Sequence, residues 1–171
     1  MLLAISPDVL VYDTTERYHV SYLAAYPRGG EKPSSSLGET HPFDRPQSAI
    51  PFRMANYSSA SLEGVVRART FLRQNDDCRA IVLEYSNGSQ RAMGDCRLGI
   101  DPVEIWNTPT CICIFKTTYN PRPLAVALQV VKVRFSEREH QHTEPGWTCH
   151  AMRGNIEFWY THDETCIGIL R

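Results

Sequence analysis

The fold is decided by one stretch of the chain, residues 78–94, which reads CRAIVLEYSNGSQRAMG. Apolar residues dominate the run before Asn87, and a shorter mixed run follows Gly88. Asn-Gly is the strongest short-range signal of a hairpin, because both residues tolerate the positive φ of a type I′ turn. We therefore predict an antiparallel hairpin with a fixed register. Side chains alternate along a strand, so one face receives Cys78, Ala80, Val82 and Glu84, and the other Ile81, Leu83 and Tyr85.

Runs with the same strand-like composition recur on both sides of this hairpin, separated by short breaks rich in Asn, Asp and Pro. Regular short strands with turn signals between them are typical of all-β domains. The run 124–135 is apolar at both parities near its start, which indicates a strand covered on two sides. The expected strands are residues 9–12, 18–25, 64–72, 78–85, 89–96, 111–118, 124–135, 154–160 and 166–170.

The first sixty residues differ in composition from the rest of the chain. Residues 27–53 hold Pro33, Pro42, Pro46 and Pro51 among many Ser and Gly, and proline cannot donate to a strand ladder. We expect an irregular loop there, either a lid over a site or a disordered segment. Residues 59–63 suggest a brief helical turn.

A chain of 171 residues fits a single domain. We therefore predict one all-β domain over residues 1–171, with its β core at 62–170. An antiparallel barrel, a sandwich and a β-prism-like fold all agree with the pattern.

Charge and hydropathy narrow the classes of partner. The formal net charge is −1, from 18 basic and 19 acidic residues, which gives no basic footprint for nucleic acid or an anionic membrane surface. No apolar run approaches the ~20 residues that span a bilayer, and the first residues lack the basic region of a signal peptide. We expect a cytoplasmic location. In a reducing compartment the six cysteines are expected to be small buried hydrophobes more often than disulfides.

Residues 62–69 and 78–94, followed by the Cys-Arg-Leu-Gly box at 96–99 and the Gly-x-x-x-Phe-Trp box at 154–159, carry a resemblance. This order of strands and boxes resembles a pattern in uncharacterised, small, β-rich fungal proteins, which implies no agreed activity. The strand and turn rhythm is also similar to jacalin-type lectins. That family binds sugar through a Gly-x-x-x-Asp loop near its C-terminal end, which this sequence lacks there, so the resemblance concerns the fold.

Two groups of residues could hold a metal. His140, His142, Cys149 and His150 are zinc-ligand types, but their spacing matches no standard zinc pattern, and a charged loop is the favoured interpretation. Cys111 and Cys113 would share one face of a strand with Phe115, which favours packing. We therefore predict no metal and no cofactor.

Two carboxylates are candidate acid/base groups. Glu84 lies in the most apolar run, and Glu157 would project beside Trp159, on the strand face opposite to Phe158. An enclosed carboxyl group has a raised pKa that suits a general acid or base, whereas a solvated one would be a bystander, and both alternatives are open. The candidate catalytic residues are Glu84, Glu157 and His150, and the candidate ligand-binding residues are Tyr85, Asp95, Trp147, Phe158 and Trp159.

Two hypotheses of function follow. In the first, an aromatic-lined pocket binds a small organic molecule, and its carboxylates promote a cofactor-free isomerisation or cyclisation. In the second, the domain is a jacalin-like glycan-binding or protein-interaction module without catalysis. In either case an exposed edge strand could pair two chains as a homodimer.

Overall fold

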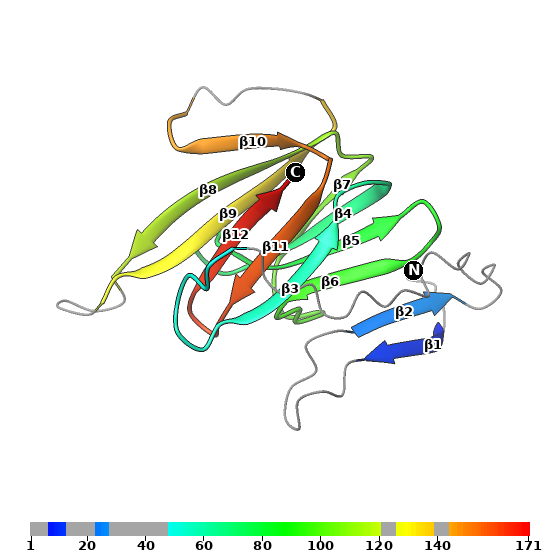
Figure 1. Cartoon of the computed structure of the whole chain (residues 1–171), viewed down its shortest axis with the longest axis horizontal. Coiled ribbons are helices and arrows are strands. Elements are labelled where there is room, and N and C mark those ends of the chain that lie inside the picture. Colours follow the sequence, from blue (N-terminus) through cyan, green and yellow to red (C-terminus); the bar gives the residue numbers. More distant parts are fainter. Residues whose placement is uncertain (1–6, 13–22, 28–47, 121–125, 139–143) are drawn as a thin grey trace.

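A computed structural model describes residues 7–12, 23–27, 48–120, 126–138 and 144–171, and for 7–12 and 23–27 it describes the backbone alone (Figure 1). Every regular element in this part of the chain is a strand, and every strand pairing is antiparallel, which confirms the predicted all-β class. Among the residues described, no helix could span a bilayer. Most of the expected loop, residues 28–47, lies outside the described residues. The loop's first residue, Pro27, ends a strand.

The N-terminal strands β1 (Pro7–Tyr12) and β2 (Leu23–Pro27) pair with each other. The other strands form three sheets. The hairpin sheet has the order β6 (Gln90–Gly94), β5 (Cys78–Tyr85), β4 (Val65–Leu72) and β7 (Val103–Asn107). The second sheet has the order β12 (Thr165–Leu170), β11 (Asn155–Tyr160) and β3 (Asn56–Ser61). The third has the order β10 (Trp147–Ala151), β8 (Cys111–Tyr119) and β9 (Leu128–Ser136).

The hairpin between β5 and β6 is confirmed, but its turn type differs from the prediction. Gly88 has a φ of 80°, whereas Asn87 is not among the residues with positive φ. The Gly88 amide donates to the Tyr85 carbonyl at 2.9 Å, and the Asn87 side chain accepts from the Ser89 amide at 3.0 Å. The loop thus has three residues, with glycine in the left-handed position at its end, which is the next commonest solution after a type I′ turn.

A β-bulge changes the predicted faces of β5. Leu72 pairs with Cys78 and Phe71 with Ala80, so Arg79 is an extra residue on the β5 side. Cys78 therefore joins Ile81 in the main core instead of sharing a face with Ala80 and Val82, which pack in a small separate cluster with Phe71. The prediction that Cys78 shares the face of Glu84 was wrong for this reason.

Residues 59–63 do not form a helical turn. Ser59 lies on β3 and pairs with Glu157 on β11, and the carbonyl of Gly154 accepts from the Leu62 amide at 2.9 Å. Pairing with β11 has overridden a weak local preference. The strands around the core therefore begin before Leu62.

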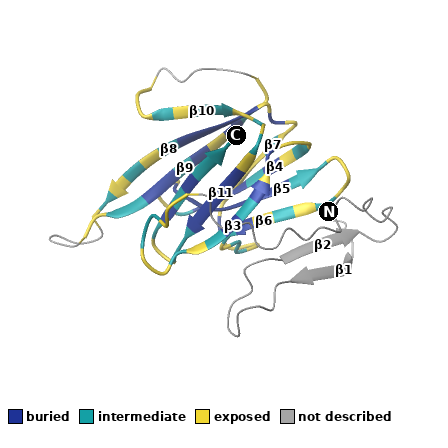
Figure 2. Ribbon diagram, in the orientation of Figure 1, coloured by how far each residue is buried: buried dark blue, intermediate teal, exposed yellow. Residues whose placement is uncertain are grey.

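One core lies between the three sheets. The edge strand β3 lies against β6, and β12 lies against β9, so the sheets follow one another around a common interior as in a sandwich or an open barrel. Buried positions run along central strands such as β5 and β11, and exposed ones lie at the turns and on edge strands such as β7 and β10 (Figure 2). The largest fully buried hydrophobic side chains of this core are Phe158, Leu62, Ile81, Leu83, Met93, Ile112, Ile156, Ile167 and Val131.

Candidate ligand-binding cleft

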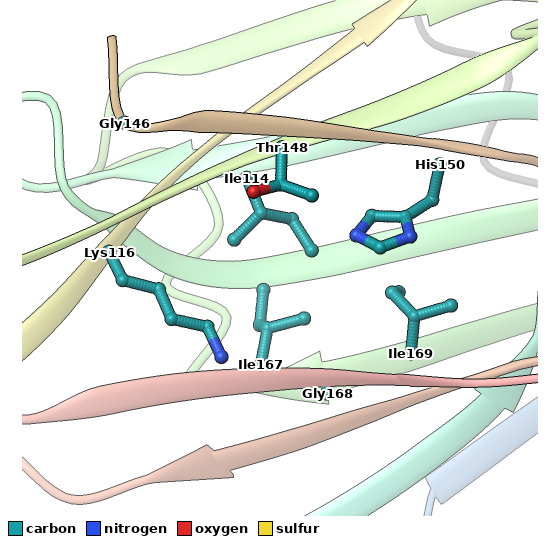
Figure 3. Close-up of a pocket in the computed structure, with 8 residues that line it drawn as sticks. All are labelled: Ile114, Lys116, Gly146, Thr148, His150, Ile167, Gly168 and Ile169. Carbon is teal, nitrogen blue, oxygen red and sulfur yellow. The ribbon is translucent and has the colours of Figure 1, made fainter.

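A cleft of about 360 Å³ lies between β12 and the part of the third sheet formed by β8 and β10. We call it the β10–β12 cleft. Its floor and walls are apolar, from Ile114, Ile167 and Ile169. Its polar side chains come from β8 and β10 and are Lys116, Thr148 and His150 (Figure 3). Gly146 and Gly168 complete the lining.

Alternation along the strands places these side chains on one side. On β10 the even positions, Thr148 and His150, face the cleft, whereas Trp147 packs against Phe115 on the other face with ring centroids 5.6 Å apart. On β8, Ile114 and Lys116 face the cleft because they have the same parity. Ile114 is buried while Lys116 and Thr148 are exposed, so the cleft has an apolar floor and a polar, solvent-exposed rim.

His150 is the most buried of the three polar side chains that line the cleft. Burial lowers the pKa of its imidazole below the ordinary value of 6.5, and the positive charges of Arg171 and Lys116 lower it further. Its Nδ1 atom is buried and has no hydrogen-bond partner among the described residues. In Figure 3 the ring projects from β10 toward Ile169 on β12. A neutral imidazole offers one donor and one acceptor, so the ring could bind a polar group of a ligand in the cleft.

Glu157 is fully buried but does not face this cleft. Its carboxylate accepts from the Tyr57 hydroxyl at 3.0 Å and from the Ser48 hydroxyl, and it lies over Gly168, where a Cβ would be 3.5 Å from Oε2. Gly168 shares that sheet face, whereas its neighbour Ile167 projects from the opposite face into the core. Glu157 and His150 therefore lie on opposite sides of β12.

Glu84 lies far from both of these groups. It is half-buried on the outer face of the hairpin sheet, where it meets Arg67 at 3.4 Å and Gln90 at 3.5 Å. Its oxygens thus have polar partners at the surface. The two predicted carboxylates do not share one cavity in the described residues.

The predicted aromatic residues are similarly dispersed. Trp159 packs on Tyr57 beside Glu157, with ring centroids 4.6 Å apart, and is 3% exposed. Phe158 lies in the core, and Tyr85, at its margin, donates to the Ser61 carbonyl at 2.7 Å. The remaining two lie elsewhere again: Trp147 stands under Arg134 at 5.2 Å, and Asp95 pairs with Arg79 at 2.8 Å.

Of the predicted site residues, His150 alone lines the cleft, and the lining is aliphatic rather than aromatic. Sequence reasoning missed Lys116 and Thr148. The signal that could have found Thr148 is the alternation of Trp147, Thr148, Cys149 and His150, which reads as a strand once the preceding charged run is set aside.

The predicted metal ligands separate as well. His140 and His142 lie outside the described residues, and Cys149 and His150 are neighbours on β10 that face opposite ways. Within the described ranges no three His, Cys, Asp or Glu side chains gather in a way that could hold a metal ion.

Comparisons with protein-family models, with curated proteins and with solved structures found no match. The geometry of the cleft is therefore the observation on which a function can be argued.

Proposed function

We propose that the protein binds a small organic molecule with a carboxylate or similar anionic group in the β10–β12 cleft. The observation that carries this proposal is the half-buried imidazole of His150, which lines the cleft beside Lys116 and whose Nδ1 atom has no hydrogen-bond partner among the described residues. A buried polar atom without a partner costs about 1–3 kcal/mol, and a ligand that this atom reaches when the imidazole ring turns would recover this free energy.

The positive side chains near the cleft favour an anionic ligand. Lys116 lines the cleft, and Arg171 is close enough to disfavour the protonated form of His150. An anionic group between these side chains would be attracted by Lys116 and would also favour protonation of the imidazole. The exposed hydroxyl of Thr148 adds a further donor at the rim.

The apolar part of the ligand is bounded by the three isoleucines. A volume of about 360 Å³ is near the lower end of the roughly 300–1,000 Å³ of ligand pockets. Burial against Ile114, Ile167 and Ile169 favours a compact hydrocarbon body, and the polar rim favours an acidic end. A small aliphatic or aromatic carboxylic acid has both features.

An isomerase or cyclase activity remains part of this proposal, but with His150 in place of the two carboxylates as the acid/base group. A proton moved within the cleft would be moved by His150, because Glu84 and Glu157 lie elsewhere. The glycan-binding alternative has less support, since none of the three tryptophans is fully exposed. A cytoplasmic location and a homodimer through an edge strand, for which β7 is available, stay predictions.

The test is calorimetric titration with a panel of small carboxylic acids, each compared with its neutral amide. We expect an acid to bind and its amide to bind at least about tenfold more weakly, because charge-assisted bonds contribute about 1.5–3 kcal/mol. Lys116→Met should weaken the acid by a similar factor. Lys132→Met is the matched control, because Lys132 pairs with Phe115 and so lies on the other face of the sheet. No binding by any acid, or equal effects of the two variants, would contradict the proposal.

A further inference from the structure

Two thiols oppose each other on the face of β10 that points away from the cleft. Cys113 on β8 and Cys149 on β10 are direct partners in the antiparallel ladder, and their Sγ atoms are 2.7 Å apart. A disulfide has an S–S distance of about 2.05 Å, so only a small movement separates these thiols from a bond. All six cysteines lie in the described part of the chain, and all are thiols in this structure.

We propose that Cys113 and Cys149 are a redox-active pair that a peroxide converts to a cross-strand disulfide. The two residues differ in access, which sets the order of steps. Cys149 is half-buried and Cys113 fully buried, and burial raises the pKa of the Cys113 thiol, as does its hydrogen bond with Cys149. Cys149 is therefore the sulfur that meets the oxidant, and Cys113 is the resolving thiol.

The chemistry balances with hydrogen peroxide as the oxidant. The Cys149 thiolate attacks one peroxide oxygen, so that an S–O bond forms, the O–O bond breaks, and the hydroxide released takes up the former thiol proton as water. The Cys113 sulfur then attacks the sulfenic sulfur. The S–S bond forms, the S–O bond breaks, and hydroxide leaves with the Cys113 proton as a second water. Two thiols are oxidised and one peroxide is reduced.

The bond would fix the strand that carries two cleft residues. In the part of the chain that the structure describes, β10 pairs with β8 alone and forms the edge of its sheet. Thr148 and His150 flank Cys149 and project to the opposite face, into the cleft. A covalent link at Cys149 holds their backbone against β8, which lowers the ordering cost of binding. This consequence, unlike the disulfide itself, rests on the proposed function.

The disulfide is tested on the full-length protein without any ligand. Reduced protein is treated with hydrogen peroxide at a small molar excess, alkylated and mapped by peptide mass spectrometry. We expect the loss of two alkylatable thiols and a cross-linked peptide pair containing Cys113 and Cys149, which a reductant reverses. Unchanged thiols, a cross-link between other cysteines, or oxidation of Cys149 that a reductant does not reverse would overturn the proposal.

A matched pair of variants refines the test. Cys111 lies two residues before Cys113 on β8 but pairs with Ala151, so Cys111→Ser should still form the cross-link. Cys149→Ser lacks one thiol of the proposed pair, so peroxide should not cause the loss of two alkylatable thiols in this variant. Because both variants could perturb folding, circular dichroism is recorded first, and the peptide map of the unaltered protein decides the question by itself.

The effect on the cleft is measured separately. The affinity of an acid identified by titration is compared between reduced and peroxide-treated protein, with Cys149→Ser treated in the same way. We expect about two- to tenfold tighter binding after oxidation, in the unaltered protein alone. If no acid binds, the proposed function fails while the cross-link is still observed. If an acid binds but no cross-link forms, the redox pair fails alone.

Discussion

His150 couples the cleft to pH through a single imidazole. Its pKa in the folded protein is lowered from 6.5 by burial, then by Arg171 and Lys116. Below pH 6.5 the unfolded chain therefore binds more protons than the folded one, so the free energy of unfolding falls as the pH falls from 6.5 through the lowered pKa. Above that window this contribution is constant.

We predict that His150→Gln makes the free energy of unfolding less dependent on pH below 6.5. Urea denaturation at a series of pH values from neutral to mildly acidic measures this slope. His162→Gln is the control, since His162 is exposed in the turn between β11 and β12 and contributes its backbone carbonyl to Arg73. Equal slopes in the unaltered protein and His150→Gln would show that His150 is not the titrating group.

Glu157 shows which features of a side chain the neighbouring sequence predicts and which it does not. The period of two along β11 predicts that Glu157 and Trp159 project opposite to Phe158, and both sets are buried. The partners of Glu157 could not be predicted, because Tyr57 lies 100 positions away and Ser48 lies 109 positions away. The strand face of a side chain follows from a local pattern, whereas its burial and its hydrogen-bond partners depend on which strands meet.

Gly94, the last residue of β6, sets how closely two sheets approach. Its φ is 85°, and a Cβ there would clash with the Arg79 carbonyl oxygen and would lie 2.8 Å from Phe158. Arg79 is the bulged residue of β5, and Phe158 belongs to β11. The absence of a side chain at Gly94 thus permits the bulge and the core packing together.

We predict that Gly94→Ala lowers the free energy of unfolding by roughly 2–4 kcal/mol, from backbone strain and overpacking together. Gly99→Ala separates the two terms, because Gly99 has a φ of 74° but nothing within 4 Å of an added Cβ. That control should cost only about 1–2 kcal/mol. Chemical denaturation of both variants is the measurement, and equal losses would contradict a packing role for Gly94.

The elements that sequence reasoning missed are short strands at sheet edges. β7 is mostly exposed, and β10 follows a charged, histidine-containing run, so neither shows a sustained apolar alternation. The central strands β5 and β8 were predicted because burial on both sides demands apolar residues at most positions. The cleft was missed with β10, because two of its three polar side chains come from that strand.

At the scale of the whole molecule, contacts between distant segments join the sheets. Arg73, after β4, donates to the carbonyls of His162 and Asp163 in the turn of the C-terminal hairpin, at 2.8 and 2.6 Å. The Thr165 hydroxyl at the start of β12 accepts from the Val131 amide at 3.2 Å. Each contact links two different sheets, so the sheets should unfold together.

A substitution of the core residue Phe158 tests whether the three sheets unfold together. It is fully buried, stacks near Tyr160 with ring centroids 5.9 Å apart, and meets Gly94 of another sheet. We predict that Phe158→Ala lowers the free energy of unfolding by about 3–5 kcal/mol. Ile105→Ala, at a position 57% exposed on β7, should cost less than about 1 kcal/mol.

Unfolding by urea is followed by far-ultraviolet circular dichroism and by tryptophan fluorescence. The three tryptophans lie on β7, β10 and β11, one in each of the three sheets, so fluorescence samples all three sheets. Because the sheets share that core, the two signals should give the same midpoint in the unaltered protein and in Phe158→Ala. Two separated transitions would mean that one sheet unfolds by itself and would contradict a single core shared by the three sheets.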